Sequence, residues 1–242
     1  MCSDGVKAIF FDLDNTLIDT AGANRTAIQK VQELLGTRFG QEDIGAICER
    51  FRVKLLQESY QPSEDVTIDD VRVTHWEEAI QEVAGKGPDR TLAAECYSMW
   101  KSTRLQLLAI PGPVRALLED LRETHKLLLL TNGVAQTQRE KIEAVRCEGL
   151  FHAVVVGGEH AEEKPASSIF CHCFQLLGVA PRDCVMVGDS LDTDIQGGAN
   201  AGVRATVWVN GDGRTAPPEA SVRPDYTITT VLELPRVLAA LH

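Results

Sequence analysis

Lys7-Ala8-Ile9-Phe10-Phe11 leads directly into Asp12-Leu13-Asp14-Asn15-Thr16. The apolar run predicts a buried strand, so the two carboxylates follow at its carboxyl end, where open α/β sheets bind ligands. Two aspartates one residue apart repel each other unless a cation or a shared proton relieves the repulsion. The segment therefore indicates a site for a metal and a phosphate.

A plain turn is the alternative interpretation of this segment, because Asp and Asn both favour turns and helix caps. Taken alone, Asp14-Asn15 is compatible with a turn and with a functional site. The order of the motifs that follow along the chain decides between the two.

The composition is that of an ordinary globular protein, with 242 residues, 44% hydrophobic residues and a formal charge of −11. This length fits one large domain or a main domain with a smaller insert. The negative charge argues against nucleic acid or a membrane surface as a partner, because both require a basic face. An anionic small-molecule substrate would need local positive charge.

The expected location is the cytoplasm, because no segment reaches the ~18 consecutive apolar residues of a membrane span and the N-terminal apolar run is too short for a signal peptide. Seven cysteines without a Cys-x-x-Cys pair predict reduced thiols. Cys171-His172-Cys173 lies in a predicted helix, where adjacent side chains point apart, so a metal site there is disfavoured. The oligomeric state stays open, and a monomer is compatible with the sequence.

Further apolar runs predict a parallel sheet that is buried on both faces. Helical patterns separate these runs, so the chain is predicted to have an α/β fold with a doubly wound parallel sheet. The predicted strands after the first are residues 126–131, 153–156, 184–188 and 205–209, and the predicted helices are residues 113–123, 136–145, 166–177, 193–201 and 230–241.

A long helical stretch separates the first strand from residue 111, and at roughly 85 residues it exceeds the crossover of a compact βαβ unit. We predict an inserted helical-bundle domain over residues 20–104, with the core formed by residues 1–19 and 105–242. The predicted helices of the insert are residues 24–35, 41–57, 67–83 and 90–103.

Polar residues follow the later strands as well. Thr131-Asn132-Gly133 comes after the second core strand, where a hydroxyl and successive backbone N–H groups could hold a phosphoryl oxygen. Lys164 stands just before a predicted helix. Each signal has a simpler explanation by itself, a turn in one case and a solvated loop lysine in the other.

Acidic residues also follow the fourth strand, in Gly188-Asp189-Ser190-Leu191-Asp192-Thr193-Asp194. Asp192 or Asp194 is compatible with capping the next helix. Asp189 lies at the strand end, beside a site that is already acidic. A hard divalent cation with oxygen ligands resolves this crowding, and Mg²⁺ with a few carboxylates and substrate phosphate is the usual arrangement.

The order strand-Asp-x-Asp-x-Thr, strand-Thr, loop-Lys and strand-Gly-Asp-x-x-x-x-Asp resembles the haloacid dehalogenase (HAD) superfamily. The resemblance covers about residues 7–209 and implies a Rossmann-like core with an inserted cap of the C1 class. It implies a Mg²⁺-dependent hydrolase that acts on phosphate esters through an aspartyl-phosphate. A dehalogenase is disfavoured, because that branch lacks the second aspartate, Asp14.

The resemblance also implies a role for each motif residue. Asp12 would attack phosphorus, and Asp14 would act as general acid and then general base. The metal would be held by the Asp12 carboxylate, the Asp14 backbone carbonyl and Asp189, with Asp194 in a supporting position. Phosphoryl oxygens would be held by Thr131, Lys164 and the backbone N–H groups of Leu13, Asp14, Asn132 and Gly133.

Longer segments resemble one branch of the superfamily whose substrates are phosphorylated sugar acids, which implies a role in carbohydrate metabolism. They are residues 10–23, 75–82, 100–106, 127–143, 154–159 and 184–198. Arg104, Arg72 and Lys101 are candidates for the substrate carboxylate, because guanidinium groups pair bidentately with carboxylates. Solvated surface charge is the alternative for each of them.

Two alternatives concern the reaction. The core motifs leave open a phosphatase or a phosphomutase that acts on another sugar phosphate, because both use the same two aspartates. A phosphoacceptor receiver domain also places acids, a Thr and a Lys around Mg²⁺. A receiver has neither the helical insert nor the Asp-x-Asp-x-Thr order, so it is disfavoured.

Overall fold

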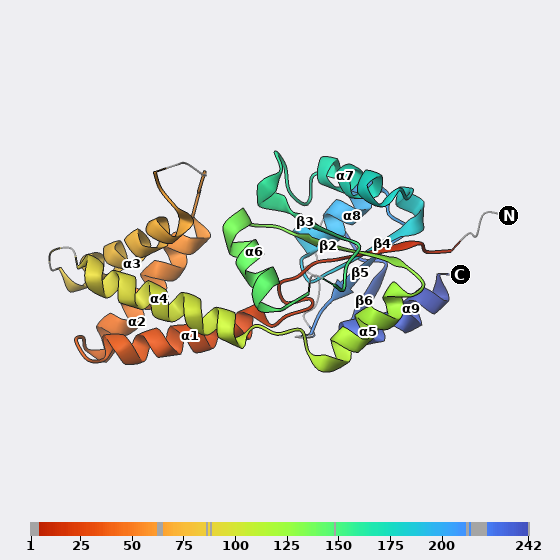
Figure 1. Ribbon diagram of the computed structural model, residues 1–242. Coiled ribbons are helices and arrows are strands. Elements are labelled where there is room, and N and C mark those ends of the chain that lie inside the picture. The colour runs from red at the N-terminus through yellow and green to blue at the C-terminus, as the bar shows by residue number, and fades with distance from the viewer. Residues whose placement is uncertain are drawn as a thin grey trace. The chain divides into compact units, whose positions relative to one another are not determined.

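The chain forms two compact units in the computed structural model, which describes residues 5–61, 65–85, 87, 89–147, 149–211, 213 and 222–241 (Figure 1). The core unit consists of Met1–Asp19 and Ala109–His242, and the helical unit is Thr20–Leu108. The sequence places the second boundary after residue 104. The last helix of the insert instead continues to Leu107, so the units divide after Leu108.

The core unit is built on a parallel sheet, as the sequence predicts. Its described strands run in the order β3-β2-β1-β4-β5-β6. The chain adds strands to one side of β1 up to β3 and then to the other side from β4 onward, so that β1 pairs with both β2 and β4. Such a switch point is where doubly wound sheets bind ligands. The strands are β1 (Ala8–Phe11), β2 (Lys126–Thr131), β3 (Ala153–Val156), β4 (Cys184–Gly188), β5 (Ala205–Val209) and β6 (Tyr226–Ile228).

Helices cover both faces of this sheet, which explains why its central strands are apolar on both sides. Ala8 and Phe10 pack in one hydrophobic cluster with α7 (Ser167–Leu177), while Ile9 and Phe11 are buried on the opposite face. Figure 1 shows α7 and α8 (Gln196–Ala201) on one side, with α5 (Gly112–Arg122) and α9 (Leu234–Ala240) on the other. The sheet ends that carry polar residues therefore have a rigid base.

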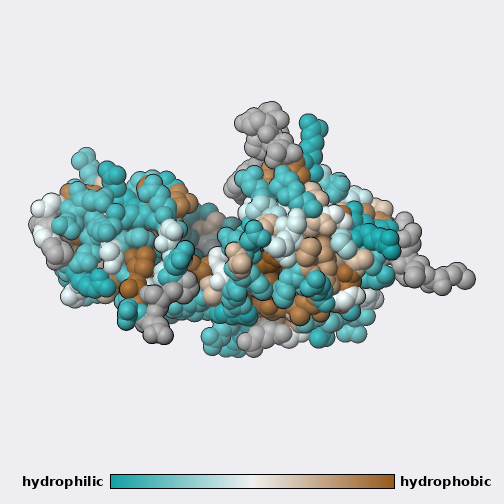
Figure 2. All heavy atoms as spheres, turned by 90° about the horizontal axis from the view of Figure 1, so that it is seen from above, coloured by the Kyte–Doolittle hydropathy of each residue, from teal (hydrophilic) through white to brown (hydrophobic). Residues whose placement is uncertain are grey.

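The helical unit contains α1 (Thr20–Leu35), α2 (Gln41–Leu56), α3 (Ile68–Ala84) and α4 (Arg90–Leu107) among its described residues. Aromatic rings form the centre of its hydrophobic core, where the Phe51 ring stacks on Trp76 at 3.8 Å between centroids. The outer face that Figure 2 shows is mostly hydrophilic. The unit thus has its own core.

Side-chain caps fix the first residues of α3 and α4. Thr67 and Asp70 form a reciprocal capping box at the start of α3, and the Asp89 side chain accepts from the Leu92 N–H at the start of α4. Such caps satisfy N–H groups that have no partner within the helix.

The six described cysteines are free thiols, and Cys2 lies outside the described residues. Within the part of the chain that the structure describes, no helix has the length and apolar character needed to cross a bilayer.

Candidate active site

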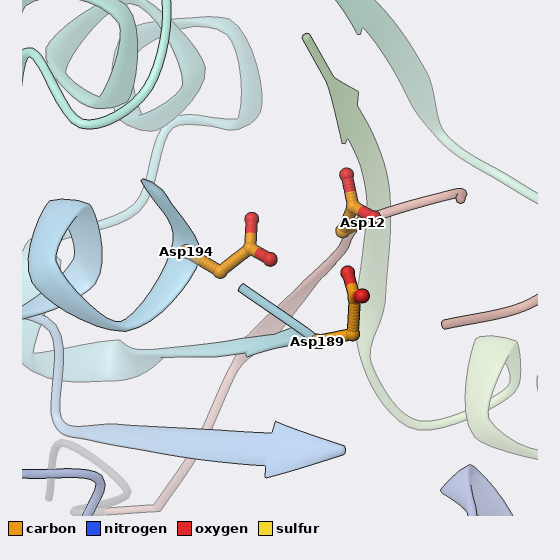
Figure 3. A group of neighbouring side chains, drawn as sticks. All are labelled: Asp12, Asp189 and Asp194. Carbon is orange, nitrogen blue, oxygen red and sulfur yellow. The ribbon is translucent and has the colours of Figure 1, made fainter. Parts of the chain in front are cut away.

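Three carboxylates meet at the carboxyl ends of β1 and β4 (Figure 3). Asp12 follows β1, Asp189 follows β4, and Asp194 comes from the helical turn Leu191–Ile195. One carboxylate oxygen of each residue lies within 4.8 Å of the others. Because β1 and β4 are parallel neighbours, the two strand ends bring residues far apart in sequence to one place.

The buried ammonium of Lys164 joins two of these carboxylates. Its Nζ lies 2.7 Å from Asp12 Oδ1 and 2.7 Å from Asp194 Oδ1, and it also donates to the Leu130 carbonyl at 2.7 Å. The side chain is only 1% exposed. An ammonium has three N–H donors, so these three acceptors match its full capacity.

The Asn132 side chain fixes the backbone at Lys164. Asn132 Nδ2 donates to the Lys164 carbonyl at 2.7 Å, and the Lys164 N–H donates to Asn132 Oδ1 at 3.1 Å. The loop that carries the lysine is thereby attached to the residue that follows β2. This use of the Asn132 side chain was not predicted from the sequence.

Asp194 is turned inward rather than used as a helix cap. Its Oδ2 accepts from the Ser190 backbone N–H at 3.0 Å, whereas the Ser190 hydroxyl accepts from the Thr193 N–H. A side chain at Gly188 would overlap the Asp194 carboxylate, so only glycine fits there. Asp192 is exposed and stands outside this arrangement.

Burial and crowding alter the acidity of these groups. Burial raises the pKa of Asp12 to about 7, with Lys164 opposing the rise and Asp194 adding to it. Burial likewise raises the pKa of Asp189 to about 6, again with a contribution from Asp194. Although burial opposes it, the carboxylates of Asp12 and Asp194 raise the pKa of Lys164. One ammonium therefore faces three acids, and this shortage of positive charge fits a divalent cation with oxygen ligands.

Asp14 lies in a turn and also faces the site, so the two interpretations of Asp14-Asn15 are compatible. Asn15 adopts a left-handed conformation with φ 56°, and its N–H donates to the Ile18 carbonyl at 2.8 Å. The Asp14 carboxylate lies 2.8 and 2.7 Å from Lys141 Nζ and 3.1 Å from Gln138 Nε2.

Gln138 and Lys141 both belong to α6 (Ala135–Ala144) and were missed by sequence reasoning. Their spacing of three residues puts them on one helix face. Both side chains are buried. No feature of the sequence shows that this polar face turns toward the sheet, because the same pattern is typical of a solvated helix.

The predicted phosphate loop lies at the end of β2. Thr131 is buried, and its Oγ1 accepts from Gln138 Nε2 at 2.5 Å. Gly133 has φ 113°, a conformation that favours glycine, and its N–H donates to Glu163 Oε2 at 3.0 Å. Leu13 is buried directly after Asp12. Their predicted contacts with phosphoryl oxygens stay predictions.

The three basic residues considered for the substrate carboxylate lie in the helical unit, two of them over the Trp100 ring and Lys101 over the Tyr97 ring. Arg72 and Arg104 place their guanidinium carbons 5.9 and 4.2 Å from the Trp100 ring centroid. Arg72 also forms a bidentate pair with Glu58, at 3.2 and 2.9 Å, and Lys101 Nζ lies 2.9 Å from Asp69. Arg72 and Lys101 thus already have acidic partners.

The comparison with known proteins agrees with the geometry of the core unit. A sequence model of haloacid dehalogenase-like hydrolases matches residues 6–202. The chain belongs to the haloacid dehalogenase-like hydrolases. The family predicted from the order of the motifs is therefore confirmed.

Named relatives show which branch of the family the chain resembles. The chain is 55% identical to the N-acylneuraminate-9-phosphatase of Mus musculus over 98% of this chain and 95% of the relative, and equally to that of Homo sapiens. The resemblance to this branch, predicted from the sequence, is confirmed. Among solved structures, the HAD hydrolase YfnB of Bacillus subtilis matches with a TM-score of 0.70 over 97% of this chain and 99% of that one. At 22% identity, that likeness concerns the fold alone.

Replacing Lys164 with Met should lower the free energy of unfolding by about 3–5 kcal/mol, because it leaves two buried carboxylates without their shared cation. Urea unfolding in EDTA at neutral pH measures the loss. Lys7→Met is the matched control, because Lys7 pairs with Asp183 near the opposite end of β1 and is 46% exposed. That variant should lose less than about 1 kcal/mol. Equal, small losses in both variants would contradict the role given to Lys164.

Proposed function

We propose that this protein is a Mg²⁺-dependent phosphatase that hydrolyses N-acylneuraminate 9-phosphate to the free sugar acid and phosphate. The observation that carries the chemical part is the group of carboxylates around Lys164, with Asp14 beside it. The 55% identity to N-acylneuraminate-9-phosphatases over nearly the whole chain supports the substrate.

Asp12 is the proposed nucleophile. Lys164 holds its Oδ1 at 2.7 Å and the Thr16 hydroxyl donates to its Oδ2 at 3.4 Å, so the carboxylate has a fixed orientation. Attack of a carboxylate oxygen on phosphorus forms an aspartyl-phosphate while the bond between phosphorus and the sugar oxygen breaks. Water then hydrolyses this intermediate, so that one difficult step becomes two easier ones.

Asp14 is the proposed general acid and base. It would donate a proton to the departing sugar oxygen in the first step and take one from the attacking water in the second. The same aspartate thereby returns to its starting state after each turnover. This role separates the proposal from dehalogenation, in which no alkoxide leaves.

The Asp12 carboxylate, the Asp189 carboxylate and the Asp14 backbone carbonyl would hold Mg²⁺, with Asp194 supporting them. Mg²⁺ bound there supplies positive charge that offsets the repulsion between a carboxylate nucleophile and a phosphate. The fit rests on the three crowded acids and on the raised pKa values of Asp12 and Asp189.

The phosphoryl oxygens would be held by groups at the ends of β1 and β2. Lys164 supplies a compact charge, and the Thr131 hydroxyl supplies a hydrogen-bond donor. The remaining proposed donors are the backbone N–H groups of Leu13, Asp14, Asn132 and Gly133. Because the Gly133 N–H is bonded to Glu163, substrate would have to displace that carboxylate for this donor to take part.

The helical unit is the proposed cap domain, with substrate choice as its function. Arg104, Arg72 and Lys101 are proposed for the sugar carboxylate, because Arg72 and Arg104 bring positive charge to the Trp100 ring and Lys101 brings it to the neighbouring Tyr97 ring. Arg72 and Lys101 would have to exchange acidic partners for the sugar carboxylate, because Glu58 and Asp69 lie within 3.2 Å of them.

Phosphate release from a substrate panel tests the proposed activity. We expect release from N-acylneuraminate 9-phosphate to exceed release from hexose and pentose phosphates that lack a carboxylate, and EDTA to abolish it. Asp12→Asn should abolish turnover while the protein still folds, because the amide is a far weaker nucleophile of the same size.

The outcomes of this panel separate the levels of the proposal. Mg²⁺-dependent release from other sugar phosphates alone would overturn the substrate and keep the phosphatase. Interconversion of sugar phosphates without release would favour a mutase. Turnover by Asp12→Asn near the wild-type rate would refute the nucleophile.

The acidic site also predicts how Mg²⁺ affects stability. A carboxyl group whose pKa is raised in the folded chain binds protons there that the unfolded chain releases, so the stability it contributes is lost as pH rises through its folded pKa. The folded pKa is about 6 for Asp189 and about 7 for Asp12, so both contributions are lost once the pH lies above these values. A cation that binds the ionised carboxylates offsets the loss.

A fixed concentration of Mg²⁺ should therefore raise the unfolding temperature more at about pH 8 than at about pH 6, because protons compete for the same oxygens at the lower pH. Differential scanning fluorimetry with and without Mg²⁺ measures both increments. Asp189→Asn should lose most of the increment at the higher pH. An increment that is equal at both pH values would contradict a metal site at these acids.

A further inference from the structure

The Asp14 carboxylate is held by two side chains from one face of α6. Lys141 Nζ contacts both carboxylate oxygens, at 2.8 and 2.7 Å, and Gln138 Nε2 lies 3.1 Å from Oδ2. The same Nε2 donates to the Thr131 hydroxyl at 2.5 Å. One helix face thus connects the proposed acid–base group with the proposed phosphate-binding hydroxyl.

The ion pair between Lys141 and Asp14 is not the arrangement expected if these residues served folding stability alone. The Lys141 side chain is 8% exposed and that of Asp14 is 26% exposed. Burying such an ion pair costs desolvation, and well-packed apolar side chains often serve stability equally or better. The pair does give a carboxylate at the open end of the sheet a defined orientation, which is what proton transfer to a bound substrate requires.

We propose that Lys141 and Gln138 are positioning residues for the reaction, which fix the Asp14 carboxylate in line with the oxygen of the leaving alcohol. The inference rests on the proposed phosphatase function and deepens it. Both residues act through the Asp14 carboxylate rather than on phosphorus or the sugar oxygen. During the first step an Asp12 carboxylate oxygen bonds to phosphorus, the P–O bond to the sugar breaks with its electron pair left on the sugar oxygen, and the Asp14 proton moves to that oxygen.

Loss of the positioning residues should affect substrates differently, according to how well their leaving groups depart without a proton donor. A sugar alkoxide is a poor leaving group and depends on a well-placed proton donor, whereas p-nitrophenolate leaves without one. Displacing Asp14 should therefore harm the first substrate and spare the second. A general loss of folding or of phosphate binding would harm both equally.

The test compares kcat/KM of wild type and Lys141→Met for N-acylneuraminate 9-phosphate and for p-nitrophenyl phosphate, both with Mg²⁺. This constant covers the steps through formation of the aspartyl-phosphate, so it isolates the transfer that needs the acid. We expect a loss of about 10- to 100-fold for the sugar phosphate and less than about threefold for the aryl phosphate. Gln138→Leu should show the same selectivity to a smaller extent.

Two further variants make the test specific. Lys7→Met removes a lysine–aspartate pair of the core unit near the opposite end of β1 and should leave both constants at the wild-type level. Lys141→Arg keeps a cation with two donors near Asp14, so it should recover part of the activity on the sugar phosphate. It also provides the measurement if Lys141→Met does not fold.

Equal losses on the two substrates, or no loss on either, would overturn the positioning role while the phosphatase proposal stands. A wild-type protein that releases phosphate from neither substrate would instead refute the proposed function itself. If the wild type hydrolyses only another sugar phosphate, that ester takes the place of the first substrate and the comparison is unchanged.

Discussion

The buried ammonium of Lys164 is the interaction on which the rest of the site depends. It donates to Asp12, to Asp194 and to the carbonyl of Leu130 at the end of β2, so it joins three segments that are far apart in the sequence. Without this charge, two almost fully buried carboxylates would face each other across the end of β1. Asn132 holds the backbone of Lys164, which makes the loop part of the sheet edge.

The site still has fewer positive charges than its acids require. Burial raises the pKa values of Asp12 and Asp189, which means that ionised carboxylates are costly there in the absence of a further cation. A structure under selection for stability alone would remove one of these acids. Three acids at a switch point of the sheet are what a site that binds a metal and a phosphate requires, because both ligands become part of the charge balance.

The sequence was sufficient for the parts of the structure that depend on local pattern. The strands at residues 126–131, 153–156, 184–188 and 205–209 agree with the structure, because near-continuous apolar runs have no other stable place than a sheet covered on both faces. The edge strand Tyr226–Ile228 was missed, since a strand of three residues is too short to carry a periodic signal. The boundary after residue 104 fell too early, because α4 continues past the core of its own unit.

The candidate site was predictable only where motif residues follow strands directly. The acids after β1 and β4 could be placed together because parallel strand ends share one edge. Gln138 and Lys141 could not, because their contacts with Asp14, 124 and 127 residues away in the sequence, depend on how α6 packs against the sheet. The candidates for sugar recognition, Arg104, Arg72 and Lys101, depend on the substrate as well as on the chain.

A crystal structure of the protein with Mg²⁺ and beryllium fluoride tests the central claim most directly, because beryllium fluoride bonded to a carboxylate has the shape and charge of an acyl phosphate. We expect the adduct on Asp12, a metal ion held by Asp12 and Asp189, and Lys164 still in contact with Asp12. An adduct on another residue, or a metal held elsewhere with this cluster empty, would contradict it.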